Sequence, residues 1–222
     1  HPGRLVRGLA DALPRHGVNI RTGVTVAGIE RDAKGKCIGA RLSTGEIVHG
    51  ENVVLAAGIW SSELAKSAGI SVPMQPARGY HVQLDGVPQL PVTGGVMHET
   101  FVAYNPMGNQ LRLAGTLEIA PVGRPWMRRR LNALIAGARK YLYGIDSGRV
   151  TAEWAGYRPC TADGMPVIGF AKSTPGLYIA TGHAMMGLML GPITGRIIAA
   201  DICGQTQSID PEILAAVRPD RR

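Results

Sequence analysis

The sequence is poor in cysteine and aromatic residues and has no long apolar run. Its three cysteines, Cys37, Cys160 and Cys203, are far apart and odd in number. This argues against a disulfide framework and against a zinc site, and it favours a reducing compartment. The longest uncharged apolar stretch, Ala184 to Gly195, is shorter than the roughly 18 residues that indicate a membrane span. No secretory signal is present either, so we expect a cytoplasmic protein.

The basic charge of the chain is scattered along it. The 222 residues carry a formal net charge of +8, which by itself favours nucleic acid or an anionic membrane as a partner. Only Arg128–Arg130 and Arg221–Arg222 form clusters, and the aromatic residues, 5% of the chain, are not interleaved with basic ones as a surface for single-stranded nucleic acid requires. We therefore expect no nucleic-acid partner. We interpret the basic run of the predicted helix as a solvated face; it consists of Arg128, Arg129, Arg139 and Lys140.

Hydrophobic residues make up 45% of the chain, enough for one large domain or two small ones with their own cores. The first 72 residues predict an amphipathic helix at Leu5–Leu13 that ends at Gly17, and an apolar strand at residues 53–58 that is buried on both faces. Between them we expect a meander of short strands at Val18–Ile20, Val24–Glu30, Cys37–Leu42 and Ile47–Val48. Ser61 or Ser62 is expected to cap a short helix at residues 63–67.

From residue 73 the pattern changes to strands with few helices. Strands are expected at residues 79–84, 101–104, 110–116 and 149–158, with a hairpin turn at Asn105–Asn109 and a basic amphipathic helix at residues 126–142. Together they predict a separate antiparallel layer. The two-residue period of a strand places Trp154, Gly156 and Arg158 on one face.

The most informative stretch is Leu177–Ile202, where a short apolar strand turns through Thr181-Gly182-His183 into a glycine-rich helix. Such a turn aims several free N–H groups at one point, and the helix dipole adds partial positive charge there, so the turn suits an anion. Residues 205–222 are polar and are predicted to form a loosely held tail with a short helix near residues 211–217.

Three motifs follow one another in the C-terminal half: W-x-G-x-R-P at Trp154–Pro159, D-G-x-P-x-I-G at Asp163–Gly169, and A-T-G-H-x-x-x-G at Ala180–Gly187. Their order and spacing resemble the C-terminal half of the D-amino acid oxidase family of FAD-dependent amine oxidoreductases, which includes D-amino acid dehydrogenases and glycine or sarcosine oxidases. The implied fold class is α/β plus α+β. Residues 1–72 and 159–204 would form part of a Rossmann-type FAD-binding domain, residues 73–158 an inserted mixed or antiparallel-sheet substrate domain, and residues 205–222 a tail.

Arg158 is the main candidate for contact with the substrate. A guanidinium on a strand, held by the fixed ring of Pro159, can bind a carboxylate through two parallel hydrogen bonds. The resemblance implies that Arg158 holds the α-carboxylate of the substrate; the alternative is a structural ion pair with Asp163 or Glu153. Three tyrosines are candidates for closing a pocket over the amine or side chain, or are sheet residues with their hydroxyls at the rim: Tyr80, Tyr104 and Tyr157.

The resemblance also implies the contacts with FAD. The N–H groups after Gly182 and His183 would face the flavin and stabilise negative charge on the reduced ring; they belong to Ala184, Met185, Met186, Gly187 and Leu188. His183 is interpreted as a turn and packing residue, because removal of a hydride needs no strong protein base. Further implied contacts are Val26, Gly58, Gly164 and Ile168. The alternative for all of them is an ordinary role in strands and turns.

The sequence lacks the G-x-G-x-x-G loop that binds the pyrophosphate of a dinucleotide, and no P-loop replaces it. Family members carry this loop at the N-terminus of a chain nearly twice as long. Because the chain also begins at His1 without an initiator methionine, we expect a truncation, a processed product or a subunit. The N-terminal half or a partner subunit would supply the loop, and the isolated chain is expected to be inactive.

The sequence therefore predicts an enzyme that oxidises D-amino acids, or a related secondary amine, by hydride transfer to FAD. Family glycine oxidases have an arginine two residues after the Gly-His pair, whereas Met185 occupies that position here, which favours a dehydrogenase of larger D-amino acids. The alternatives are a glycine- or sarcosine-type oxidase and a non-catalytic subunit acting as an interaction module. Oxygen and a quinone remain open as electron acceptors, and with a quinone the cytoplasmic protein would sit peripherally at the inner membrane.

Overall fold

The computed structural model describes residues 1–221, and the chain forms two compact units. Unit 1 comprises His1–Gln75 and the chain from Pro159 onward, and unit 2 comprises Pro76–Arg158. Unit 2 is therefore inserted into unit 1, and the chain crosses between the units within two long strands, β5 (Met74–Asp85) and β9 (Arg149–Thr161).

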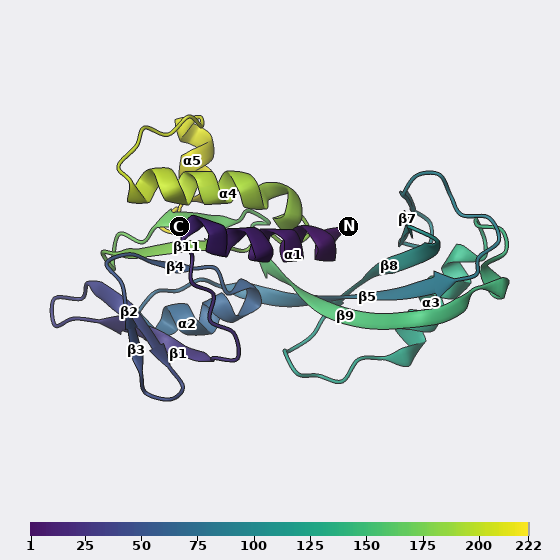
Figure 1. Ribbon diagram of the computed structural model, residues 1–222, viewed down its shortest axis with the longest axis horizontal. Coiled ribbons are helices and arrows are strands. Elements are labelled where there is room, and N and C mark those ends of the chain that lie inside the picture. The colour runs from purple at the N-terminus through teal and green to yellow at the C-terminus, as the bar shows by residue number, and fades with distance from the viewer. Residues whose placement is uncertain (222) are drawn as a thin grey trace. The chain divides into compact units, whose positions relative to one another are not determined.

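The first sheet of unit 1 is an antiparallel meander in the order β1-β2-β3 (Figure 1). Before it, the amphipathic helix α1 runs into a 3-10 turn and ends at Gly17, whose φ of +76° suits glycine. The bounds are α1 Pro2–Ala12, β1 Val26–Arg31, β2 Cys37–Leu42 and β3 Ile47–His49. The predicted strand at Val18–Ile20 is wrong: the residues are apolar enough, but no strand of the described chain pairs with them.

The second sheet of unit 1 has the order β10-β11-β4, with β11 parallel to β4 and antiparallel to β10. Alternate residues of β11 enter two different cores: Leu177 and Ile179 lie in one, and Tyr178 lies in the other with Ile197 of helix α4. Burial on both faces explains the continuous apolar run in this strand. The bounds are β4 Val53–Leu55, β10 Val167–Phe170, β11 Leu177–Thr181 and α4 Gly187–Ile202.

Strand β4 lies at the edge of this sheet. Val54 is 42% exposed, so the expectation that the whole apolar run at residues 53–58 is buried on both faces is wrong. The strand also ends at Leu55, and a 3-10 turn at Gly58–Trp60 runs straight into helix α2 (Ser61–Ser67). Because this turn already places both serines inside the helix, neither caps it, and Ser62 Oγ donates instead to the Val72 carbonyl at 2.5 Å.

The C-terminal residues are held by packing and by ion pairs. Helix α5 (Pro211–Val217) buries Leu214 and Val217 in the same core as Tyr178. After it, Arg218 pairs with Asp201 and Arg221 with Asp163. The expectation of a loosely held tail is therefore wrong, because two apolar side chains and two ion pairs fix a segment whose composition is mostly polar.

Unit 2 is a twisted sheet in the order β6-β7-β8-β5-β9, with helix α3 against one face (Figure 1). Leu131, Leu134 and Ala138 of α3 lie in one core with Tyr80 and Val82 of β5, as the predicted apolar stripe requires. The basic side of α3 includes Arg128, which pairs with Glu153. The remaining bounds are β6 Gly95–Met97, β7 Val102–Met107, β8 Gln110–Ile119 and α3 Arg128–Ala138. The β7–β8 turn is shorter than expected and consists of Gly108-Asn109.

Candidate functional site

Arg158 lies near the end of β9 in unit 2, and its side chain fills the space beside Gly79. Its guanidinium lies where a Cβ atom at Gly79 would be, and its Nη1 donates to the Thr116 carbonyl at 3.3 Å. The pairing of β5 with β8 shifts from Arg78–Glu118 to Tyr80–Gly115, so β8 contains an extra residue opposite Gly79.

The bulge in β8 carries backbone strain. Thr116 has a φ of +67°, a conformation that a β-branched residue rarely adopts and that costs on the order of 1–3 kcal/mol. This conformation directs the Thr116 carbonyl to the Arg158 guanidinium. Strain of this kind clusters at functional sites, and here it orients the side chain that the sequence singled out.

Both carboxylates considered as structural partners of Arg158 form an ion pair with an arginine. Glu153 pairs with Arg128, and Asp163 pairs with Arg221 at 3.1 Å. Trp154 lies on the same face of β9 as Arg158, as the two-residue period predicts, and its indole covers Gly156. The ring of Trp154 also lies 5.4 Å from that of His81, centroid to centroid.

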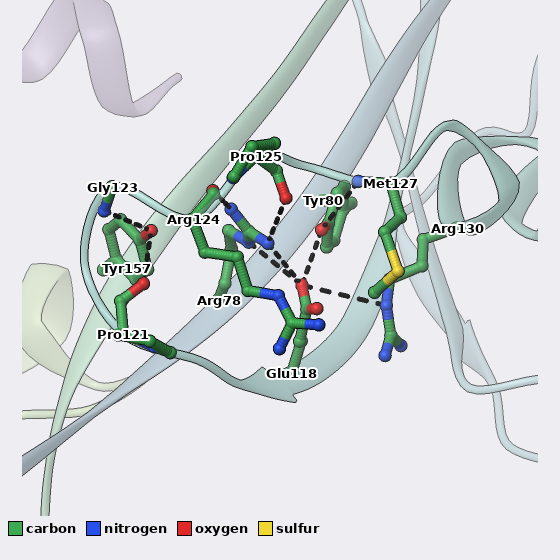
Figure 2. Close-up of polar contacts among 10 residues, drawn as sticks. All are labelled: Arg78, Tyr80, Glu118, Pro121, Gly123, Arg124, Pro125, Met127, Arg130 and Tyr157. Atoms are coloured by element: carbon green, nitrogen blue, oxygen red, sulfur yellow. Dashed lines mark hydrogen bonds and ion pairs between the residues drawn. The ribbon is translucent and has the colours of Figure 1, made fainter.

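The three candidate tyrosines have different surroundings. Tyr80 is 1% exposed; its hydroxyl donates to Glu118 at 2.6 Å and accepts from the Met127 N–H at 3.2 Å (Figure 2). Tyr80 thus belongs to the interior under α3, and we leave it out of the proposed substrate contacts. The Tyr157 hydroxyl donates to the Pro121 carbonyl and accepts from the Gly123 N–H, both at 3.1 Å. Tyr104 is half-buried and packs against the core of unit 2.

A buried ion pair that sequence reasoning missed holds the loop between β8 and α3 (Figure 2). The side chains of Arg78 and Glu118 are each 4% exposed and 2.9 Å apart, and Arg78 also donates to the carbonyls of Arg124 and Pro125. Burial favours the neutral form of Glu118, but hydrogen bonds from Tyr80 and Arg78 outweigh it and hold its pKa below the ordinary value. Because the partners are 40 residues apart, no local pattern could have identified the pair.

In unit 1, the turn between β11 and α4 is also strained. Ala184 has a φ of +47° and donates its N–H to the Pro159 carbonyl at 3.0 Å, while His183 forms an isolated β-bridge with Cys160. Gly182 has a φ of +81°, and a Cβ atom there would lie 2.8 Å from Thr161 Cγ2. The turn therefore needs glycine at position 182.

The N-terminus of α4 presents unpaired amides. Met186 is its N-cap residue and supplies no side-chain acceptor. Within the described residues, no acceptor is recorded for the N–H groups of Met185, Gly187 and Leu188. Met185 is 70% exposed, so the amides stand at an open, apolar surface. This arrangement can bind a flat, electron-rich or anionic group.

His183 is attached to α4 through Thr194. His183 Nε2 lies 2.9 Å from Thr194 Oγ1, which itself donates to the Leu190 carbonyl at 2.8 Å. Because the threonine hydrogen is used there, the histidine must donate from Nε2. Burial lowers the pKa of His183, which keeps the ring neutral. A neutral imidazole with this contact anchors the turn to the helix.

The other predicted cofactor contacts lie partly beside this turn. The Gly58 carbonyl accepts from Thr181 Oγ1 at 2.9 Å, which ties the turn after β4 to the end of β11. Since β4 and β11 are parallel, both turns follow the carboxyl ends of strands, where ligands bind in open α/β sheets. Gly164 is in a turn with a φ of +75°. The side chain of Ile168 points away into the core with Tyr178.

Val26 lies in an apolar groove of about 750 Å³ next to the open edge of β4. Val54, Leu55 and Trp60 also line this groove. Sequence reasoning identified Val26 but not the groove, because the apolar residues that line it come from three separate segments. Among residues 1–221, no cluster of three or more side chains could hold a metal ion, and no helix is long and apolar enough to cross a membrane.

Comparisons with known proteins cover nearly the whole chain. A D-amino acid dehydrogenase of Xanthobacter autotrophicus is 35% identical over 216 residues, which are 96% of this chain and 50% of that protein. A glycine oxidase of Pseudomonas aeruginosa is 31% identical over 94% of this chain and 57% of its own length. The chain thus spans about half the length of the curated relatives it matches.

Solved structures agree with these relatives. The crystal structure of glycine oxidase from Geobacillus kaustophilus superposes with a TM-score of 0.87 at 27% identity, covering 98% of this chain and 57% of that one. L-proline dehydrogenase from P. horikoshii, at 21% identity and a TM-score of 0.84, shares the fold. The predicted fold class, resemblance and cofactor are confirmed. The profile of the DAO family, described as FAD dependent oxidoreductase, matches residues 1–201, and the chain belongs to this family.

Proposed function

We propose that this chain is the C-terminal part of an FAD-dependent amine oxidoreductase that oxidises D-amino acids to the imine, which water then hydrolyses. FAD, when bound, supplies the hydride acceptor. The observation that carries the proposal is the path of β9: Arg158 is followed directly by Pro159, whose carbonyl accepts the Ala184 N–H. One strand thus bears the candidate carboxylate ligand and fixes the turn with the free amides.

Arg158 binds the substrate α-carboxylate in this proposal. Its guanidinium is positioned by the Thr116 carbonyl and by the missing side chain at Gly79. A guanidinium held in this way can donate two parallel hydrogen bonds to a carboxylate and so orient the α-carbon. Tyr104 and Tyr157, like Tyr80, lie on the α3 side of the sheet, opposite Arg158, so we leave them out of the proposed substrate contacts.

The turn at Gly182–Leu188 meets the flavin in this proposal. The three amides without an acceptor, the strained Ala184 and the lack of a side-chain N-cap fit a flat group that gains negative charge. Gly58 and Gly164 belong to neighbouring turns. His183 stays neutral and positions the turn without exchanging a proton with substrate.

The chain needs a further polypeptide segment to hold FAD. No G-x-G-x-x-G loop is present in the sequence, while the edge of β4, the apolar groove beside it, and Leu5, Val6 and Leu9 of α1 are all exposed. A βαβ unit carrying the pyrophosphate loop would cover such surfaces. We therefore propose that the N-terminal half, or a partner subunit, supplies this unit and that the chain alone does not turn over.

The test is an assay of the chain together with the N-terminal half. D-alanine, D-proline and sarcosine are supplied with oxygen alone or with an artificial quinone. We expect D-alanine or D-proline oxidation with the quinone, and about a hundredfold lower kcat/KM for Arg158→Met. Activity on none of the substrates, in protein that carries FAD, contradicts the proposal. A quinone-dependent enzyme would also be tested for binding to inner-membrane vesicles.

A glycine-type oxidase is the second candidate, because the glycine oxidase of G. kaustophilus superposes with a TM-score of 0.87. The same assay separates the two, since this candidate predicts oxygen consumption with glycine or sarcosine and no need for a quinone. A non-catalytic interaction module predicts that FAD never comigrates with the chain, even when the N-terminal half is present.

A further inference from the structure

The face of the unit 2 sheet opposite α3 carries a second guanidinium besides that of Arg158. Along β5, Tyr80, Val82 and Leu84 are buried under α3, so Gly79 and His81 face the other way. Arg158 occupies the space above Gly79. Two residues further along the same face, His81 Nδ1 lies 3.3 Å from Nη2 of Arg112.

Arg112 is a half-buried cation whose guanidinium contacts a histidine. Among residues 1–221, no carboxylate lies within ion-pair distance of it, and its recorded side-chain partner is His81. Burial lowers the pKa of Arg112, but a guanidinium remains charged at any physiological pH. A partly desolvated charge without a partner is unfavourable, and an anionic group bound beside it would relieve that cost.

His81 complements this cation. The guanidinium donates to Nδ1, so the neutral ring carries its hydrogen on Nε2 and offers a second donor. Burial and the nearby Arg112 lower the pKa of His81 to about 4, which keeps the ring neutral at physiological pH. The Trp154 ring packs on His81, with centroids 5.4 Å apart, and limits its movement.

We propose that Arg112 and His81 bind a second acidic group of the substrate, so that the enzyme takes amino dicarboxylic acids in preference to uncharged amino acids of the same length. The inference rests on the proposed role of Arg158 as ligand of the α-carboxylate. Gly79 and His81 are about 7 Å apart along the strand, a separation that the two carboxylates of D-glutamate can bridge between the guanidiniums of Arg158 and Arg112.

The kinetic test compares D-glutamate with D-glutamine, which has the same length and no side-chain charge, in the FAD-loaded holoenzyme. The wild type should favour D-glutamate, and Arg112→Met should reduce the ratio of their kcat/KM values by about ten- to a hundredfold. Arg112→Lys should retain part of the preference. Arg149→Met is the matched control, because Arg149 is exposed on β9 and paired with Asp85. An unchanged ratio in Arg112→Met overturns the inference.

A binding test separates this inference from the proposed function. In the chain carrying Trp60→Phe and Trp126→Phe, Trp154 is the remaining tryptophan. Its fluorescence reports on the surroundings of His81, because the two rings are in contact. Glutarate should produce a saturable fluorescence change that propionate does not, and Arg112→Met should abolish it. If the holoenzyme oxidises no amino acid but this change occurs, the proposed function fails and the anion site stands. No selective change with glutarate overturns the anion site, whatever the activity.

Discussion

The two faces of the unit 2 sheet hold arginines in opposite electrostatic situations. On the face under α3, Arg78 pairs with Glu118 and donates to two carbonyls, so a buried cation has all the partners it needs. On the other face, Arg112 contacts a neutral histidine and no carboxylate of the described chain. The first arrangement fixes a loop, whereas the second is suited to a ligand. Partners, and not the residue type, distinguish a structural arginine from a binding one.

The largest expected effect on stability comes from breaking the buried ion pair between Arg78 and Glu118. Glu118→Gln leaves the buried Arg78 without its counter-charge and should lower the free energy of unfolding by about 3–5 kcal/mol. The matched control is Glu153→Gln, because Glu153 pairs with the exposed Arg128; we expect a loss of less than about 1 kcal/mol there. Urea unfolding measures both, and equal losses would show that burial does not separate the two pairs.

The next effect concerns the site around Arg158. In Gly79→Ala the new methyl group occupies the position of the guanidinium, so Arg158 must move. We expect kcat/KM for D-alanine to fall about tenfold or more in the complete enzyme, with a stability change within about 1 kcal/mol because the flexible end of a side chain yields. Activity equal to wild type would mean that the position of Arg158 does not matter.

The pH dependence of unfolding should report on His81, which lies on the face of the unit 2 sheet opposite α3. The pKa of His81 falls from 6.5 to about 4 on folding, so between these values the unfolded chain binds more protons. Its contribution to stability is complete above pH 6.5 and is lost as the pH falls towards 4. The full shift corresponds to about 3 kcal/mol, and for a half-exposed ring we expect about 1–2 kcal/mol. Unfolding measured from pH 4 to 7 should show a smaller slope in His81→Gln, and an identical slope would contradict the assigned environment.

The smallest expected effect is the gain in stability when the backbone strain at Thr116, in the bulge of β8, is relieved. Asparagine tolerates the left-handed conformation of Thr116 better than a β-branched residue does, so Thr116→Asn should stabilise the protein by about 0.5–1 kcal/mol. The Thr116 carbonyl, and with it the contact to Arg158, is retained. Thermal unfolding measures the gain. A loss of stability would indicate that the threonine side chain has a packing role that outweighs the backbone strain.

Local patterns in the sequence predicted much of the fold. The strand Cys37–Leu42 and the helix Pro211–Val217 follow their apolar patterns and turn residues. The failures have a common cause, since Val18–Ile20 lacks a neighbouring strand and Ser61 lies inside a helix that an upstream turn begins early. Pairing partners and the exact start of a helix are set by tertiary context, which local propensity does not contain.

Sequence motifs indicated some residues of the candidate site, whereas residues outside these motifs could not be predicted. The sequence located Arg158 and the turn at Gly182–Leu188, because proline and glycine mark backbone positions with few alternatives. It missed Arg112 and the pair Arg78–Glu118, whose significance depends on partners that are 31 and 40 residues away. The strain at Thr116 likewise comes from the register between β5 and β8, which the sequence alone does not determine.

Recognition of the carboxylate by Arg158 can be measured directly by comparing D-alanine with D-alaninamide in the complete, FAD-loaded enzyme. The amide lacks the negative charge, so the wild type should prefer D-alanine by about a hundredfold in kcat/KM, and Arg158→Met should remove most of that preference. An Arg158→Met variant that folds, binds FAD and still prefers D-alanine as strongly as the wild type would contradict the account.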